Sequence, residues 1–215
     1  MKVSVLIVAM TATCLSGCAV VSDEPLFSAG QAAPHPLAEG LWALSGPGCD
    51  VRPDPVAPLP DCAMPVSIRG GRMNWDTVAY IGRTFGPAGQ ALSAMPLPKT
   101  SAFLLVEGDP DIVELLNGPT NDAPPAPAGL PPRPPLKPSY LALREVHVSP
   151  TGRVDAAIVW PVLCPMTPGQ PGFEATPVGC RVTSIPALRE RAAKPPPPAM
   201  SLFMTWIRGE TGASG

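Results

Sequence analysis

Short runs of apolar residues, separated by stretches rich in proline and glycine, are the main pattern along this chain. Most of these runs have the length of a β-strand and are too short for an average helix. Several neighbouring runs are joined by tight turns, so the sheet is expected to be largely antiparallel. The predicted strands cover residues 40–44, 66–69, 72–75, 77–81, 103–106, 140–148, 154–160 and 201–207.

Two of the strand pairs carry clear hairpin signals. Gly70-Gly71 separates the strands at 66–69 and 72–75, and glycine supplies the positive φ that a two-residue turn requires. The sequence Ser-Pro-Thr-Gly at residues 149–152 separates the strands at 140–148 and 154–160. Both pairs are therefore predicted to be antiparallel neighbours.

Two segments show helix signals. Asp109-Pro110 precedes an apolar–acidic stretch at residues 111–117 that ends before Gly118, which predicts a short helix with a cap, a first-turn proline and a glycine stop. A second short helix is predicted over residues 186–193, with Ser184 near its N-cap. The sequence thus indicates a mainly β fold, a single antiparallel barrel or sandwich with two short helices.

Proline is unusually frequent, with 33 among 215 residues, compared with roughly 5% in an average protein. Proline neither continues a helix nor donates to a sheet ladder, so long loops are expected. Residues 119–138 contain nine prolines and predict a solvated, polyproline-like loop. One β-rich domain over residues 39–210, carrying this loop, accounts for the length.

The N-terminal segment has the anatomy of a secretion signal. Lys2 precedes an apolar run over residues 3–12, which is too short to span a bilayer. Small residues then lead into Leu15-Ser16-Gly17-Cys18. This ending resembles the lipobox of bacterial lipoproteins, which implies that residues 1–17 are removed and that the Cys18 sulfur carries lipid, with acyl chains such as palmitate.

The lipoprotein resemblance also implies a location. The mature protein is expected in the cell envelope, held on a membrane by its lipid, and Ala19 after the cysteine resembles the outer-membrane class that faces the periplasm. Residues 18–38 show no periodicity and are predicted to be a flexible tether. A formal net charge of −2 argues against a nucleic-acid partner, whereas an envelope protein partner is compatible with it.

Four further cysteines follow the lipobox, and an oxidising envelope favours disulfides between them. Three pairings are open, and we favour the local one, Cys49–Cys62 and Cys164–Cys180, because each pair flanks one proline-rich loop. The alternative, a zinc site, lacks a C-x-x-C pair and has only two histidines available in the chain.

Gly40-Leu41-Trp42 resembles the G-x-W that opens the first strand of lipocalins and of small barrel inhibitors of secreted metalloproteases. The resemblance implies that the tryptophan plugs one end of an antiparallel barrel. The inhibitor families also have a disulfide between early strands, which Cys49–Cys62 would match.

No motif identifies a catalytic residue, a cofactor or a metal. Residues 107–111 hold three carboxylates, but they lack the glycine and glutamate of a calcium loop and suit a strand-to-helix turn. His35 lies in the predicted tether, and His147 lies on a strand as a solvated residue. Nucleophile-elbow, zinc-protease and phosphate-loop motifs are absent from the sequence.

The sequence therefore predicts a lipid-anchored, non-enzymatic envelope protein that acts as a binding or structural module. Two alternatives stay open: an inhibitor of secreted proteases, and a lipocalin-like carrier of a small apolar ligand. A wide apolar cavity would favour the carrier, and a filled barrel with a protruding N-terminal segment would favour the inhibitor. Clustered polar residues in a closed cleft would favour an enzyme.

Overall fold

A computed structural model describes residues 19–53, 58–75, 100–116, 137–167, 169–176, 179–194 and 201–209. Strands dominate these residues, together with one α-helix and one short 3-10 helix. In chain order the elements are β1 (Val20–Val21), η1 (Ala29–Gln31), β2 (Gly40–Ser45), β3 (Ala63–Arg69), β4 (Arg72–Trp75), β5 (Thr100–Val106), β6 (Asp111–Leu116), β7 (Ser139–Val148), β8 (Val154–Pro161), β9 (Phe173–Thr176), β10 (Gly179–Val182), α3 (Ile185–Ala192) and β11 (Leu202–Arg208).

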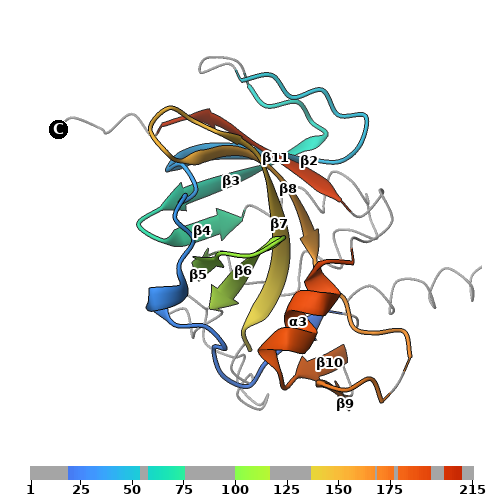
Figure 1. Cartoon of the computed structure of the whole chain (residues 1–215). Helices are drawn as coiled ribbons and strands as arrows, with labels where there is room; N and C mark the ends of the chain where they lie inside the picture. The colour runs from blue at the N-terminus through green and yellow to red at the C-terminus, as the bar shows by residue number, and fades with distance from the viewer. Residues whose placement is uncertain are drawn as a thin grey trace, which may run out of the picture.

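Eight of the described strands form a closed antiparallel barrel (Figure 1). The hydrogen-bonded order runs β6-β5-β4-β3-β2-β11-β8-β7, and β6 also pairs with β7, which closes the sheet. This architecture agrees with the barrel that the strand pattern predicted as one of two options. The predicted hairpins are confirmed as β3–β4 and β7–β8.

Apolar side chains fill the barrel, because each of its strands contributes a buried residue to one cluster. Alternate residues of a strand point to opposite faces, so these residues share the inner face of the closed sheet. The representatives from successive barrel strands are Trp42, Val66, Met73, Leu105, Val113, Leu143, Val159 and Met204, all at most 6% exposed.

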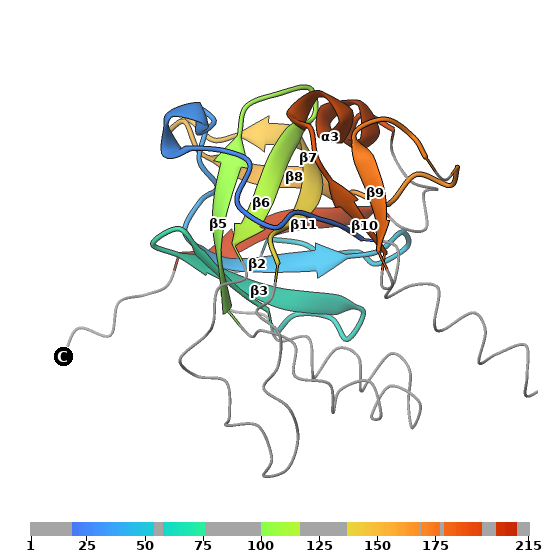
Figure 2. The same ribbon diagram turned by 90° about the horizontal axis from the view of Figure 1, so that it is seen from below.

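A second apolar cluster covers part of the outside of the barrel. Val106, Ile112, Ala142 and Trp160 face outward from β5 to β8 and pack against α3, β1, β9 and β10. Figure 2 shows α3, β9 and β10 gathered on this side, away from β3. Leu188 and Ala192 are fully buried here, which fixes the helix to the sheet.

Residues 29–38, which we call the strap, run across one end of the barrel. Ala32 bridges Val106, the Ala33 N–H donates to Leu105 O, and Leu37 bridges Val154. Leu37 is buried against the barrel core. The structure thus differs from the predicted flexible tether: residues 19–38 are held by backbone hydrogen bonds whose partners lie far away in the sequence.

The predicted helix over residues 111–117 is wrong, because residues 111–116 form β6. Pro110 lies between the end of β5 at Val106 and the start of β6 at Asp111, so it belongs to the β5–β6 turn and not to a first helical turn. The second predicted helix corresponds to α3, whose N-cap Ser184 accepts a hydrogen bond from Ala187 N–H at 3.3 Å. Strand 77–81, residues 1–18 and nearly all of the proline-rich loop lie outside the described residues.

Gly40 is the glycine that the barrel most clearly requires. Its φ is +129°, and an added Cβ would lie 2.2 Å from the Arg208 carbonyl oxygen, where β2 meets the end of β11. We predict that Gly40→Ala lowers the free energy of unfolding by about 3 kcal/mol, through backbone strain and overpacking. Denaturant unfolding measures this loss.

Gly46→Ala is the matched control, because nothing lies within 4 Å of its added Cβ and its φ is not positive. Its unfolding free energy should change by less than about 0.5 kcal/mol. Equal losses for the two variants would show that the close approach of β2 and Arg208 does not exist.

Candidate functional site

Two open depressions of the described surface lie at the end of the barrel that the strap crosses. The first has a volume of about 350 Å³, and the second about 370 Å³. The first is lined by Pro34, His35, residues 107–111 and residues 143–145. The second is lined by Ala38, Glu39, Ser149, Thr151, Arg153, Asp155 and Trp206. Each depression therefore combines the strap with the turns between barrel strands.

The first depression gathers carboxylates around one imidazole. His35 Nδ1 lies 3.6 Å from Glu145 Oε2. Asp111 is 8% exposed, and its Oδ1 accepts a hydrogen bond from Gly108 N–H at 2.8 Å. Burial raises the pKa of Asp111, and the nearby charges of Glu145 and Glu107 raise it further. The strap thus brings His35 to a carboxylate that is distant in sequence.

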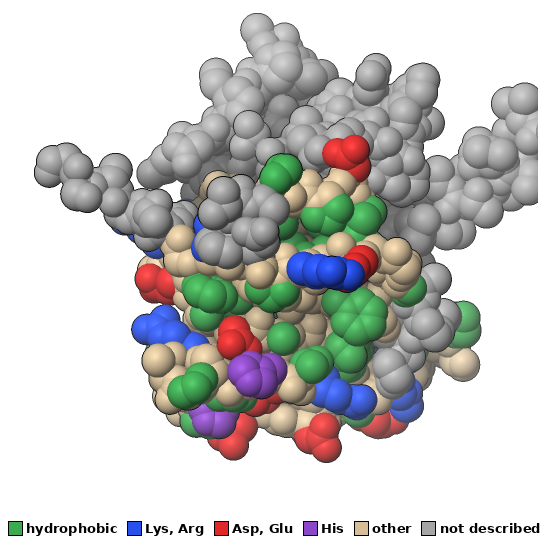
Figure 3. Space-filling model, turned by 90° about the horizontal axis from the view of Figure 1, so that it is seen from above, with side chains coloured by type: hydrophobic (Ala, Val, Ile, Leu, Met, Phe, Trp, Pro, Cys, Tyr) green, Lys and Arg blue, Asp and Glu red, His purple; other side chains and the backbone are tan. Residues whose placement is uncertain are grey.

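The second depression is bordered by fixed polar groups. Trp206 Nε1 donates to the Glu39 backbone oxygen at 3.0 Å, and Gly70 N–H donates to Glu39 Oε1 at 3.2 Å. His147 Nδ1 lies 2.5 Å from Asp155 Oδ1 on the neighbouring strand. Figure 3 shows both histidines beside acidic side chains on this face of the molecule.

These arrangements hold no recognisable catalytic set among the described residues. Each histidine contacts a carboxylate, and Ser149 Oγ and Thr151 Oγ1 contact each other at 2.9 Å rather than a base. In the described parts of the chain, no three His, Cys, Asp or Glu side chains are placed to hold a metal ion.

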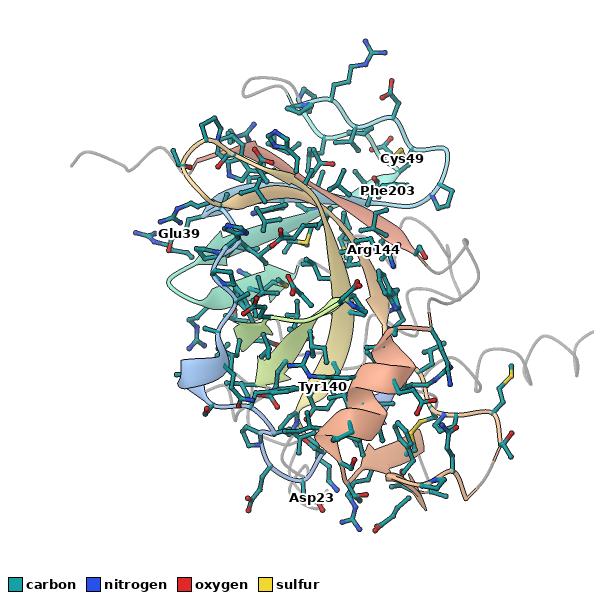
Figure 4. All side chains as sticks on the ribbon, viewed as in Figure 1. Asp23, Glu39, Cys49, Tyr140, Arg144 and Phe203 are labelled. Atoms are coloured by element: carbon teal, nitrogen blue, oxygen red, sulfur yellow. A yellow bond between two sulfur atoms is a disulfide. The ribbon has the colours of Figure 1, made fainter. Side chains whose placement is uncertain are left out.

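A buried polar network that the sequence did not reveal lies under the N-terminal segment. Glu114 on β6 is fully buried, and its Oε1 accepts hydrogen bonds from Leu26 N–H at 2.7 Å and from Tyr140 OH at 3.2 Å. Ser22 Oγ lies 2.5 Å from Tyr140 OH. Burial raises the pKa of Tyr140 far above its usual range. Tyr140 is labelled beside α3 in Figure 4. The hydrogen bonds of this network hold residues 22–26 against the barrel.

The four cysteines form two disulfides, Cys49–Cys62 and Cys164–Cys180, the pairs that the sequence analysis favoured. The first closes the loop between β2 and β3, and Cys49 packs near Ala43 and Ile207 on the outside of the barrel. The second joins the segment after β8 to β10. Cys18 lies outside the described residues.

Comparisons with known proteins give no family for this chain. No protein-family model, no curated protein and no solved structure matches it.

The raised pKa of Asp111 leads to a pH-dependent prediction. A carboxyl group whose pKa is raised by folding favours the folded state when it is neutral, and this contribution is lost as the pH rises through the raised pKa. Asp111→Asn keeps an oxygen for Gly108 N–H and removes the charge. It should therefore raise the thermal unfolding midpoint at pH 7 and leave it unchanged at pH 3.

The control is Asp50→Asn, because Asp50 is exposed and its described ion pair is with the exposed Arg52. Such a pair contributes roughly 0–1 kcal/mol, so the control should not gain stability at pH 7. A lower midpoint for Asp111→Asn at pH 7 would contradict the assignment of Asp111 as a destabilising buried carboxylate.

Proposed function

We propose that this protein is a lipid-anchored, non-enzymatic module of the cell envelope, which binds a protein partner through the outer surface of its barrel. The filled interior of the barrel is the observation that supports binding at the outer surface rather than inside the barrel. Since every barrel strand directs a buried apolar side chain inward, a ligand inside the barrel would have to displace its core. Close-packed cores resist such displacement.

The strap end is the part of the described surface that we assign to partner binding. It offers two open depressions of about 350 and 370 Å³, bordered by charges of both signs and by the partly exposed Trp206. Protein interfaces combine polar rims with aromatic and arginine contacts in this way. A partner with mixed charge would complement Arg153 and the surrounding carboxylates.

Inhibition of secreted proteases is the second candidate function. It is favoured over ligand carriage by the filled barrel, by Trp42 in its interior, and by the Cys49–Cys62 bridge between β2 and β3. The N-terminal residues 19–38, however, pack against the barrel rather than protruding from it. An inhibitor built in this way would have to use the strap or the turns beside it.

The proposed lipidation rests on the sequence around Cys18. No helix in the described part of the chain is long and apolar enough to cross a membrane. Cys18→Ser should abolish incorporation of a clickable palmitate analogue and should move the protein from the membrane fraction to the soluble periplasmic fraction. The acylated sulfur is the only anchor proposed, so the loss should be nearly complete.

Cys14→Ser is the matched control, because Cys14 lies on the discarded side of the proposed cleavage site. It should leave labelling and membrane association unchanged. If intact-mass spectrometry of the wild-type protein detects no diacylglycerol on Cys18, the anchored role is refuted.

The two alternative functions are separated from the proposed one by titrations of the purified protein. A fluorescent fatty acid should show no saturable binding, because the barrel core is filled. Secreted metalloproteases should keep their activity at a tenfold excess of this protein. Stoichiometric inhibition would favour the inhibitor, and a 1:1 fatty-acid complex would favour the carrier.

A further inference from the structure

The described chain is packed from its first residue, which lies directly after the proposed lipid attachment site. Ala19 bridges Leu163, and Val20 pairs with Cys180 on β10. Val20 is fully buried, and its N–H donates to Val162 O at 3.0 Å. Cys164 Sγ lies 3.6 Å from Ala19 O, a contact without a hydrogen bond because this sulfur is in a disulfide.

This arrangement leaves almost no free chain between the lipid and the folded domain. Consecutive Cα atoms are about 3.8 Å apart, so Cys18 cannot move far from the docked Ala19. A tether of about 20 residues would instead allow an end-to-end distance of roughly 25 Å. Acyl chains on Cys18 would therefore hold the end of β8 and the β9–β10 hairpin at the bilayer surface.

The surface around Ala19 has features that suit lipid. Met166, two residues after Cys164, is 98% exposed, the highest value among the exposed large apolar side chains of the described structure. Four nearby charges are paired: Asp23 contacts both Lys137 and Arg181, and Arg181 also contacts Glu174. Figure 4 shows Asp23 beside the β9–β10 hairpin, with Glu39 on the far side of the molecule.

We propose that residues 163–167, which include Met166, and the adjacent strands β9 and β10 form a membrane-contact surface, which inserts Met166 among the lipid headgroups. This inference rests on the proposed lipidation of Cys18. Because these four charges are paired, they provide no net positive charge to attract anionic lipid. The contact of this surface with the membrane should therefore not depend on salt concentration. The strap end then faces away from the membrane, since the length of β8 (Val154–Pro161) separates the two ends by about 23 Å.

The test compares two labelled sites on the purified, lipidated protein in phosphatidylcholine–phosphatidylglycerol vesicles. Met166→Cys carries an environment-sensitive fluorophore at the proposed contact surface. Thr151→Cys, exposed in the β7–β8 turn at the strap end, carries the same fluorophore as the matched control. Lipid-borne nitroxide should quench the label at residue 166 several-fold more than the label at residue 151, and aqueous iodide should show the opposite order.

A linker variant tests the role of the short attachment. Ala followed by about 20 Gly-Ser residues is inserted between Cys18 and Ala19, which preserves the residue after the cysteine. The lipidated linker variant should lose most of the nitroxide quenching at residue 166.

Intact-mass spectrometry of each preparation shows whether the protein is lipidated, and so distinguishes failure of the contact surface from failure of the proposed anchor. If the label on the lipidated Met166→Cys protein without the linker is as open to iodide as the label on Thr151→Cys, the contact surface alone is overturned. Unchanged quenching in the linker variant would refute the role of the short attachment. Wild-type protein without lipid would overturn both this inference and the proposed anchor.

Discussion

The pairing of β6 with β7 closes the sheet, and the packing of the rest of the molecule depends on this closure. An open sheet of this size would expose two unpaired edges and one apolar face to water. Closure places the inward residues of all the barrel strands in one core around Trp42. Residues 107–110 connect β5 to its antiparallel neighbour β6, the strand that completes the barrel.

Closure alone leaves an apolar outer face on β5 to β8, which must be covered. Segments far apart in the chain cover it: Val20 and Phe27 come from the N-terminal side, and Leu188 and Ala192 come from α3. A buried carboxylate costs free energy unless hydrogen bonds compensate its desolvation. Glu114 accepts hydrogen bonds from Leu26 N–H and Tyr140 OH, so the N-terminal segment supplies part of the hydrogen bonding that this buried carboxyl group requires.

The elements that local sequence could predict are those specified by local interactions. The β3–β4 and β7–β8 hairpins carry their own turn residues, and each disulfide closes a short stretch of chain. The sequence predicts a helix at β6 because the preceding Asp109-Pro110 resembles an N-cap residue followed by a first-turn proline. Its consecutive buried residues Ile112, Val113 and Glu114 also remove the alternation that marks a strand.

The strap and the candidate site could not be predicted for a related reason. The bonds that hold the strap connect Ala32 and Ala33 with β5, and Leu37 with β8. Such bonds leave no periodic pattern in a segment rich in proline and alanine. The route of the N-terminal segment across the barrel brings His35 to Glu145 and brings the Leu26 N–H to the Glu114 carboxyl group. The spacing of these residues along the chain does not indicate either contact.

The packed N-terminal segment also limits how a protein of this design can act. A flexible tether would let one domain search a wide volume above a membrane, at the entropic cost of ordering the tether on each encounter. A domain attached at its first folded residue presents one end at a height set by the length of its barrel. Under the proposed anchor, a partner at the strap end must itself lie within a few nanometres of the same bilayer. Attachment would then select partners by position as well as by surface chemistry.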